Sequence, residues 1–582
     1  MTTLEEISSI EDEKLILPPD VNPSALRDAF VELVHTVGAE NLQIITSDRI
    51  MPDGQGDYFN LPKEHDLFYA MDKNTFLASA IVAPGSVEET STIVKVANKY
   101  LVPLWPVSRG RNLGYGGAAP RIRGSIVVDL GIRMNRVLNV DPKNATALLE
   151  PGVSYFDLHN HLQKNGIHHL WIDNPDLGGG SVLGNTLERG AGYTPYGEHF
   201  SMHCGLEVVL PNGEIIRTGM GALPGNNTWQ LFQYGYGPYH DGIFTQSNFG
   251  IVTKMGVWLM PDPGVSLRDF VKVLSLGLNT DPLQQGYQAY HFSFPRDDDL
   301  PAIVEVIRDL RLKMIIQNAP TIRNALLDAA VYGPKSQYTS STEVLTEEEV
   351  GEIASKISVG HWNVYGALYG PKPLRDLQWE IVRTAFLTIP GATYRFPEEV
   401  DKSSGLSIIH MRDETLKGLP NTYELGWLNW RGPGGSLLGF SPISPTTGED
   451  ANKQYQMVKK RFTQFGFDYM GTFVVGWREL HHIVCLTFDK TNPTERRNAH
   501  RCISLLIDDA AREGYGEYRT HLCFMDQIAS VYNWNGNALL KFNETLKDAL
   551  DPNGIMAPGK SGIWPARFRG RGFEIVPEEP KL

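Results

Sequence analysis

The stretch that decides the fold runs from Leu104 to Pro120 and reads LWPVSRGRNLGYGGAAP. Four glycines and one asparagine occupy the eight positions from Gly110 to Gly117. Glycine tolerates positive φ and lets backbone N–H groups approach a ligand closely, so such a loop can form a concave nest for phosphate oxygens. Arg109 and Arg111 add positive charge. We therefore predict a pyrophosphate-binding loop, against the alternative of a glycine turn with a purely structural role.

The same loop also fits a looser nucleotide motif. Residues 114–119 match G-x-G-x-x-A, which in a Rossmann fold opens a helix. Pro120 follows at once, however, and the next run, 125–130, is strand-like, so no helix is expected there. The loop is therefore predicted to join two strands. Tyr115 is a bulky residue in a loop suited to close approach, and we expect its ring to face a ligand.

Composition narrows the class of protein. The chain has 582 residues, 42% of them hydrophobic and 21% charged, as is typical of a large soluble globular protein with at least two domains. Its net charge of −14 argues against a nucleic-acid or anionic-membrane partner. No apolar run reaches the roughly 20 residues that a transmembrane helix needs. The four cysteines have no C-x-x-C spacing and are expected to be reduced thiols of an intracellular protein.

The two ends of the chain bear on localisation. The first residues are acidic and lack the basic start and apolar core of a secretory signal. The last three, Pro580-Lys581-Leu582, approach the S-K-L peroxisomal address, with proline in place of the small polar residue. A peroxisomal and a cytoplasmic location are both left open.

The first half of the chain predicts an α+β domain with its ligand site in loops. Residues 76–84 form a strand-like apolar run, and Ser86 with Glu89 makes a capping box for a helix that ends near residue 101. A short helix is expected from about 154 to 164. Two further polar, glycine-containing segments, 171–185 and 244–255, offer donors to the same large ligand.

From about residue 285 the pattern changes to strands alternating with helices. We predict strands at 286–292, 362–369, 472–476 and 482–488 and helices at 299–310, 373–387 and 495–513, which together form a second domain around an antiparallel sheet. The Ser/Thr-rich segment 334–347 is the sharpest candidate for a linker. The turn-rich segment 551–562, which contains Lys560, is expected to return to the nucleotide.

Five runs of this chain together resemble the vanillyl-alcohol oxidase family of flavoproteins, which includes the flavoprotein of p-cresol methylhydroxylase. The runs are 106–120, 171–185, 192–197, 516–521 and 557–562. The resemblance covers residues 20–568 and implies an α+β fold. It implies a two-subdomain FAD-binding domain of the p-cresol methylhydroxylase type, made from residues 1–280 and 515–582. An α+β cap domain with an antiparallel sheet, residues 281–514, would carry the substrate pocket.

The resemblance also implies a chemistry. Members of the family bind a para-substituted phenol as its phenolate and pass a hydride from the carbon attached to the para position to flavin N5, which leaves a p-quinone methide. A phenol titrates near pH 10 in water, so the pocket must stabilise the anion. The matching residues are Tyr115, Tyr518 and Arg519, two hydroxyl donors and a permanent cation.

Asp176 matches the carboxylate that the family places near flavin N5, where it would act as base for water adding to the quinone methide. Its alternative role is that of a turn-capping aspartate after a proline. Asp173, three positions earlier, is the rival carboxylate.

The resemblance assigns contacts with FAD and with the substrate to loops along the whole chain. The FAD-binding residues expected are Pro106, Ser108, Arg109, Gly110, Arg111, Asn112, Leu113, Pro175, Leu177, Gly180, Ser181, Asn185, Glu188, Gly190, Tyr193, Gly250, Ile251, Val252 and Lys560. The substrate-pocket residues expected are Gly439, Thr472, Ile483 and Cys485. Relatives carry a phenylalanine where Gly439 falls, so we predict tolerance of bulkier para-substituents.

Two departures from the family concern the flavin. Relatives attach it covalently to a cap-domain histidine, but the run 431–442 contains no His, Tyr or Cys, and Leu437 stands at the matching position. The histidine that assists the attachment is replaced by Phe68. Both partners of one reaction are missing, so we predict bound but non-covalent FAD.

A third departure concerns assembly. Between Leu223 and Trp229 the chain lacks the longer insertion that joins dimers into octamers in the family, so we predict a homodimer.

The function expected is an FAD-dependent oxidase of 4-alkyl-, 4-allyl- or 4-hydroxymethylphenols that returns electrons to O₂ as H₂O₂. Three alternatives stay open: a dehydrogenase that passes electrons to a cytochrome or another acceptor, a catalytically weak flavin-binding protein, and a carbohydrate oxidase on the same scaffold. No metal is expected, because neither His481-His482 nor His199 with His203 has the further ligands of a zinc site.

Overall fold

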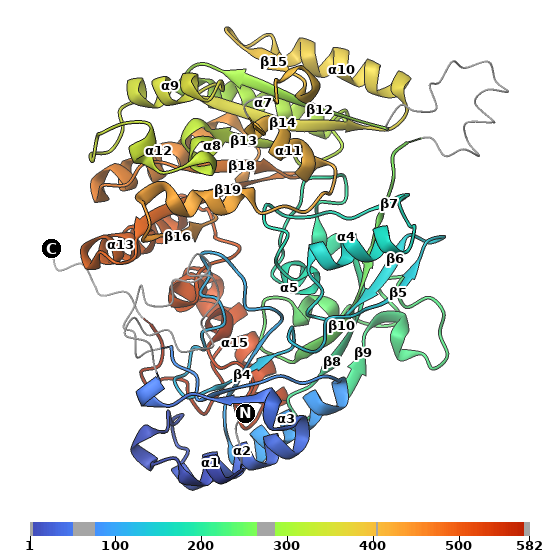
Figure 1. Ribbon diagram of the computed structural model, residues 1–582, viewed down its shortest axis with the longest axis vertical. Helices are drawn as coiled ribbons and strands as arrows, with labels where there is room; N and C mark the ends of the chain where they lie inside the picture. Colours follow the sequence, from blue (N-terminus) through green and yellow to red (C-terminus); the bar gives the residue numbers. More distant parts are fainter. Residues whose placement is uncertain (1–3, 50–75, 265–285, 403–404, 576–582) are drawn as a thin grey trace.

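The computed structural model describes residues 4–49, 76–264, 286–402 and 405–575. The chain begins with a small layer in which helices cover a four-stranded sheet of order β1-β2-β4-β3 (Figure 1). Its elements are α2 (Pro23–Val37), β1 (Leu42–Ile44), β2 (Ala80–Val82), α3 (Val87–Tyr100), β3 (Leu104–Val107) and β4 (Ile126–Asp129). The predicted capping residue, Ser86, accepts a hydrogen bond from the backbone N–H of Glu89. The predicted strand at 76–84 is wrong in extent, since only three residues pair with neighbouring strands.

A second sheet follows, with order β5-β6-β10-β8-β9 and antiparallel pairing throughout. Its strands are β5 (Val137–Asp141), β6 (Thr146–Leu149), β8 (His203–Val209), β9 (Ile215–Arg217) and β10 (Ile251–Trp258). Helix α4 (Tyr155–Lys164) starts at a capping box formed by Ser154 and Asp157. The short α5 (Val182–Leu187) begins after Ser181, directly behind the second glycine-rich segment.

The cap is built on an eight-stranded antiparallel sheet of order β15-β12-β14-β13-β18-β19-β16, with β17 paired to β19. Its strands are β12 (Tyr287–Phe294), β13 (Thr321–Asn324), β14 (Trp362–Tyr369), β15 (Thr393–Arg395), β16 (Gly435–Phe440), β17 (Ile443–Pro445), β18 (Gly471–Val475) and β19 (Glu479–Asp489). The helices are α7 (Leu300–Leu312), α8 (Ala325–Tyr332), α9 (Glu347–Lys356), α10 (Lys372–Phe386), α11 (Ile408–Leu416), α12 (Gly448–Phe465) and α13 (Pro493–Arg512). The predicted α+β class is confirmed.

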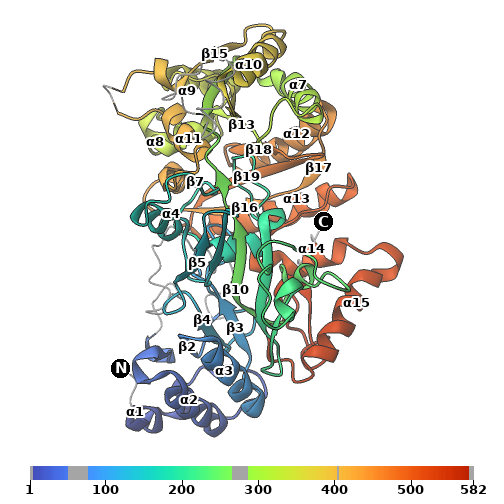
Figure 2. The same ribbon diagram turned by 90° about the vertical axis from the view of Figure 1, so that its right-hand side faces the viewer.

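After α13 the chain leaves the cap and packs beside the first two sheets (Figure 2). This return contains α14 (Met525–Val531) and α15 (Trp534–Leu550). The backbone N–H of Leu104 donates to Ile555, and the buried Lys547 ammonium donates to the carbonyls of Asn248 and Met556. Segments more than 400 residues apart therefore share one core.

The linker predicted at 334–347 is wrong. This segment lies within the cap, between α8 and α9, and its Lys335 is buried against Asp468 at 2.9 Å. A Ser/Thr-rich composition therefore marks an ordered surface turn here. Across the described ranges, no helix has the length and apolar character required to span a membrane.

Candidate active site

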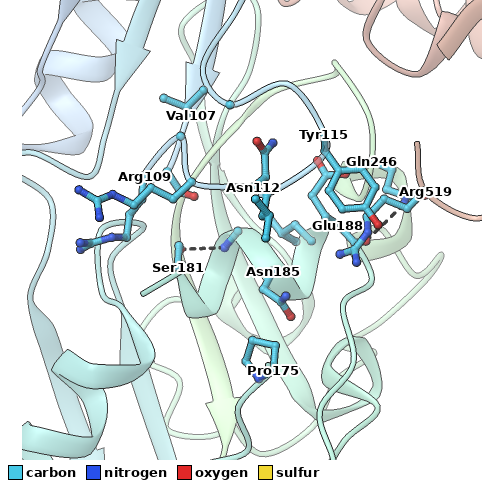
Figure 3. A pocket seen from close by; sticks show the side chains of 18 of the residues that line it. Val107, Arg109, Asn112, Tyr115, Pro175, Ser181, Asn185, Glu188, Gln246 and Arg519 are labelled. Carbon is cyan, nitrogen blue, oxygen red and sulfur yellow. Dashed lines mark hydrogen bonds between the residues drawn. The ribbon is translucent and has the colours of Figure 1, made fainter. Parts of the chain in front are cut away.

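A cavity of about 550 Å³ lies where the glycine-rich loops, the cap sheet and the C-terminal return meet. Figure 3 shows its loop side, with Arg109 pointing away at one end and Tyr115 beside Arg519 at the other. All but one of the residues expected to bind FAD line it: Pro106, Ser108, Arg109, Gly110, Arg111, Asn112, Leu113, Pro175, Leu177, Gly180, Ser181, Asn185, Glu188, Tyr193, Gly250, Ile251, Val252 and Lys560. Residues from both halves of the chain thus form one large site.

The first glycine-rich loop has the geometry that its composition predicts. Gly110, Gly114, Gly116 and Gly117 all have positive φ, a conformation that L-residues rarely adopt. A Cβ at Gly116 would lie 2.0 Å from the Leu522 side chain, which packs against the loop from the C-terminal return. The backbone therefore turns at four positions in a way that glycine alone adopts without strain, which is typical of a loop that approaches phosphates closely.

Two charged residues of the expected FAD site have protein partners. Arg109 donates to the Gly152 carbonyl at 2.8 Å, and burial lowers the pKa of its guanidinium. Lys560 pairs with Glu188 at 2.7 Å, which fixes the C-terminal return against the second glycine-rich segment. These contacts position two cavity walls before any ligand binds.

The predicted phenolate-binding residues meet at one place, although they are about 400 positions apart in sequence. The Arg519 guanidinium lies 4.5 Å from the centre of the Tyr115 ring and 5.4 Å from that of Tyr518. The Tyr115 hydroxyl is 3.4 Å from Ser441 Oγ. Burial works against the charge of Arg519, but Tyr115 and Tyr518 outweigh it and raise the pKa, so the cation persists. Burial also raises the pKa of Tyr518 to about 12, so its hydroxyl remains a proton donor.

Asp176 lines the cavity and is held by two side chains, not by the backbone of a turn. The Tyr193 hydroxyl donates to Oδ2 at 2.8 Å, and Arg412 Nη1 contacts Oδ1 at 2.5 Å. The Arg412 guanidinium also lies 4.4 Å from the centre of the Tyr193 ring. Tyr193, expected as an FAD contact, therefore also orients the carboxylate.

Behind Asp176 lies a buried chain of alternating charges that the sequence analysis missed. Arg412 contacts Glu424 at 3.2 Å, Glu424 contacts Arg323 at 3.1 Å, and Arg323 contacts Asp328 at 2.6 Å. Burial raises the pKa of Glu424, against the attraction of Arg323. Buried charges of this kind require such pairing. They come from two stretches of the chain, 323–328 and 412–424, so no spacing within either stretch could have revealed the network.

Asp173, the rival carboxylate, is bound to other groups. Its Oδ1 lies 2.7 Å from His199 Nε2, and its Oδ2 accepts from the Thr194 backbone at 2.7 Å. His199 Nδ1 lies 2.6 Å from Asn185 Oδ1, so this histidine orients an amide that lines the cavity. His203 instead contacts Asp241 at 2.9 Å. These contacts assign the two histidines to hydrogen bonding within the fold.

Two predicted site residues need correction. Thr472 is not among the described residues that line the cavity. It pairs with Ile483 across β18 and β19 and so shares the face of Ile483, but it lies one strand further from the cavity. Gly190 is likewise absent from the described lining, and it packs beneath Asn185: a Cβ there would lie 2.1 Å from Asn185 Oδ1. Glycine is required at position 190 because a side chain there would displace the Asn185 amide.

The cap side of the cavity contains the other expected substrate residues and several unexpected ones. Gly439 and Cys485 face each other across β16 and β19, and both line the cavity with Ile483. The further cap residues that line it are Thr422, Leu425, Trp427, Leu437 and Val484. This wall is mainly apolar and includes an indole, which suits an aromatic substrate. Thr422, Leu425 and Trp427 lie in or beside a long 3₁₀ segment, for which the sequence analysis had no signal.

Two family models match this chain. Residues 78–219 match an FAD binding domain, and residues 426–561 match the C-terminal domain of FAD linked oxidases. The chain is 36% identical to the 4-cresol dehydrogenase [hydroxylating] flavoprotein subunit of Pseudomonas putida, over 95% of this chain and 98% of that protein.

Two solved structures are also similar. The isoeugenol complex of 4-ethylphenol oxidase from Gulosibacter chungangensis has a TM-score of 0.87 at 39% identity and covers 95% of this chain and 100% of its own. Substrate-bound p-cresol methylhydroxylase has a TM-score of 0.84 at 34% identity, covering 94% and 99%.

Proposed function

This chain belongs to the p-cresol methylhydroxylase and vanillyl-alcohol oxidase family of FAD-dependent flavoproteins, and we propose that it is an oxidase of para-substituted phenols. The substrates proposed are 4-alkyl-, 4-allyl- and 4-hydroxymethylphenols such as vanillyl alcohol or eugenol. The observation that carries the proposal is the meeting of Tyr115, Tyr518 and Arg519 in the cavity that Asp176 also lines. This arrangement suits an aromatic oxyanion.

The protein's part in the reaction begins with the phenol oxygen. Two hydroxyl donors and a buried cation stabilise the phenolate, and the negative charge delocalised into its ring weakens the C–H bond on the carbon attached to the para position. Bound FAD supplies the hydride acceptor. The carbon skeleton that remains is a p-quinone methide, which water can attack.

Asp176 would serve both the hydride transfer and the later attack of water. Arg412 and Tyr193 hold its two oxygens, so the carboxylate has a fixed position beside the cavity. A carboxylate there stabilises positive character on the substrate and can accept the proton of an attacking water. Its proposed role is therefore electrostatic first and basic second.

The FAD is proposed to be non-covalent. Leu437, at the position that matches the attachment histidine, lines the cavity and has no nucleophilic atom. Phe68, the second residue on which this proposal depends, lies outside the described residues. The glycine-rich cradle and the polar side chains at its rim fit the cofactor without a covalent bond.

The proposed electron acceptor is O₂, with H₂O₂ as the product. A dehydrogenase that passes electrons to a cytochrome or another acceptor is the second candidate, because 4-cresol dehydrogenase is a full-length relative. The test uses the purified holoenzyme with eugenol or vanillyl alcohol. Peroxide formed in air at the rate of substrate loss supports the oxidase. Substrate turnover that requires an added cytochrome or dye would favour the dehydrogenase, and failure to bleach the flavin anaerobically would contradict both.

Assembly and location are also proposals. The absence of an insertion between Leu223 and Trp229 supports a homodimer, and light scattering of an octamer would contradict it. A peroxisomal or cytoplasmic location rests on Pro580-Lys581-Leu582, which lies outside the described residues.

A further inference from the structure

A second, much smaller cavity of about 30 Å³ is lined by His481, whose ring contacts that of Tyr518 in the phenolate site. Its charged and titratable lining residues are Glu198, Arg311, Glu479 and His481. Ala191 lines both cavities and so forms part of the wall between them. A space of this size holds one or two water molecules. We call this space the outlet cavity.

The imidazole of His481 connects the outlet cavity to the phenolate site. Its ring meets that of Tyr518 edge-on, with centroids 5.1 Å apart. Nε2 lies 3.4 Å from Glu479 Oε1, and Nδ1 is buried without a hydrogen-bond partner among the described residues. One ring nitrogen is therefore available for a water or a transient proton.

The charges around His481 favour proton exchange. Burial would raise the pKa of Glu479, but His481 and the backbone N–H of Arg478 outweigh it and lower the pKa to about 2, so Glu479 stays ionised. Burial raises the pKa of Glu198, against the opposing effect of His481. The remaining charged group that lines the cavity, Arg311, stacks on Trp477 at 4.3 Å. The surroundings therefore favour the protonated form at Glu198 and the ionised form at Glu479.

The proposed reaction requires a path by which a proton leaves the phenolate site, because a neutral phenol that binds as phenolate releases one proton. The cation of Arg519 disfavours a proton path past its own guanidinium. The other polar neighbour, Ser441, leads from the Tyr115 hydroxyl to Glu517, whose buried Oε2 has no partner among the described residues. Burial raises the pKa of Glu517 to about 8, but its side chain is 4% exposed, so a proton there has no direct exit.

We propose that the outlet cavity is the proton exit of the phenolate site: the phenol O–H bond breaks, the Tyr518 hydroxyl relays the proton, and His481 with Glu198 delivers it to solvent. The electron pair stays on the substrate oxygen, so the step needs no other reactant. This inference rests on the proposed function. It assigns to His481 and Glu198 the role of carrying the proton away from the phenolate site.

The test follows anaerobic binding of 4-tert-butylphenol to the holoenzyme. This phenol has no hydrogen on the carbon attached to the ring, so binding stops before oxidation. Three signals are recorded after mixing in weak buffer: perturbation of the flavin spectrum for binding, near-ultraviolet absorbance for phenolate, and a pH indicator for the released proton. The variants are His481→Phe, which keeps a ring against Tyr518, Glu198→Gln, and Glu352→Gln as an exposed control on α9.

The proposal predicts that His481→Phe and Glu198→Gln each slow phenolate formation and proton release by about tenfold or more, while the binding signal and the Glu352→Gln variant keep wild-type rates. The double variant, His481→Phe with Glu198→Gln, should be no slower than the slower of the two single variants, because both residues lie on the same proton path. Unchanged rates in both single variants would overturn the proposal, as would a slowing confined to Glu517→Gln. Absence of any phenolate band in the wild type would instead contradict the proposed function.

Discussion

Arg412 on α11 contacts Oδ1 of Asp176, which lines the cavity, at 2.5 Å, while the same Nη1 atom lies 3.2 Å from Glu424 Oε1. One guanidinium thus joins the carboxylate of the loop to the charge network of the cap. Burial opposes the charge of Arg412, but the Asp176 carboxylate outweighs it and raises the pKa of the guanidinium, which therefore stays charged. Asp176 is therefore a carboxylate whose position depends on residues more than 200 positions away.

Arg412→Met should test this dependence. Removing the guanidinium leaves Asp176 with only the Tyr193 hydroxyl and Glu424 with only Arg323, and breaking a buried ion pair costs about 3–5 kcal/mol of stability. We expect a lower Tm and at least about tenfold slower anaerobic flavin reduction by eugenol. Arg412→Lys keeps the charge and should recover part of the Tm. Wild-type reduction rates in both variants would show that the contact does not matter for catalysis.

Arg519→Met should weaken phenolate binding more than phenol binding. The guanidinium lies against both Tyr115 and Tyr518, and a charge-assisted contact contributes about 1.5–3 kcal/mol. We expect the Kd of 4-tert-butylphenol to rise roughly 10- to 100-fold at pH 7. The phenolate absorbance of the bound form should be lost at that pH and return near pH 10. An unchanged phenolate band would place the anion elsewhere. Lys541→Met, an exposed cation on α15, is the matched control.

Gly439→Phe should narrow the substrate range. A Cβ at this position would lie 3.2 Å from the Tyr115 hydroxyl, so a phenyl group there would occupy the space beside Cys485. We expect kcat/KM for eugenol to fall by about tenfold or more while that for 4-methylphenol falls less, since one lost apolar contact or clash changes binding by about 1–3 kcal/mol. Gly439→Ala is the control, because it removes the glycine without adding a ring to the cavity. Equal losses for both substrates would indicate misfolding or a different substrate position.

Acid precipitation should separate the flavin from the protein. No residue from 431 to 442 offers a histidine, tyrosine or cysteine side chain, and Leu437 faces the cavity. We expect a colourless pellet, a yellow supernatant and a flavin mass that equals unmodified FAD. A yellow pellet after washing would contradict the proposal, and a flavin-bearing peptide would then identify the attached residue. As a second measurement, the apoprotein should regain activity when FAD is added.

His482 should make the protein less stable as the pH falls from 7 to 5. Burial lowers the pKa of its imidazole to about 3, so the folded protein keeps it neutral, hydrogen-bonded to Tyr469 at 2.8 Å and stacked on Phe473. In the unfolded chain histidine titrates near 6.5, so below that pH the unfolded state binds the additional proton. Between pH 6.5 and 5 the free energy of unfolding should therefore fall by about 2 kcal/mol from this residue.

The measurement for His482 is Tm at pH 7 and pH 5 in the wild type and in His482→Gln. The variant should be less stable at pH 7, because it loses the ring stack, and its Tm should change less between the two pH values. His35→Gln, on the first-domain helix α2, is the control. The same pH dependence in His482→Gln as in the wild type would exclude this histidine as a source.

The sequence by itself determined the parts of this protein that depend on local chemistry. The glycine spacing at 110–117 requires positive φ and predicts a phosphate-binding loop, and the structure has that geometry. The resemblance carried by five runs predicts FAD, a cap and a phenol site, and the family models and relatives confirm the FAD-dependent family and its phenol substrates in general terms. Capping residues such as Ser86 and Ser154 begin helices where predicted, since a cap acts within one turn.

Only the tertiary structure decided which distant residues meet. Strand order and helix placement in the cap decide the Arg412–Glu424–Arg323 network and the contact of His481 with Tyr518. They also place Thr472 beside Ile483, one strand further from the cavity. Periodicity shows which face a residue shares with its neighbours in the chain, but not which strand lies beside it. Buried ion pairs leave no periodic trace, because each partner is one charged residue in its own segment. Their pairing follows from packing alone.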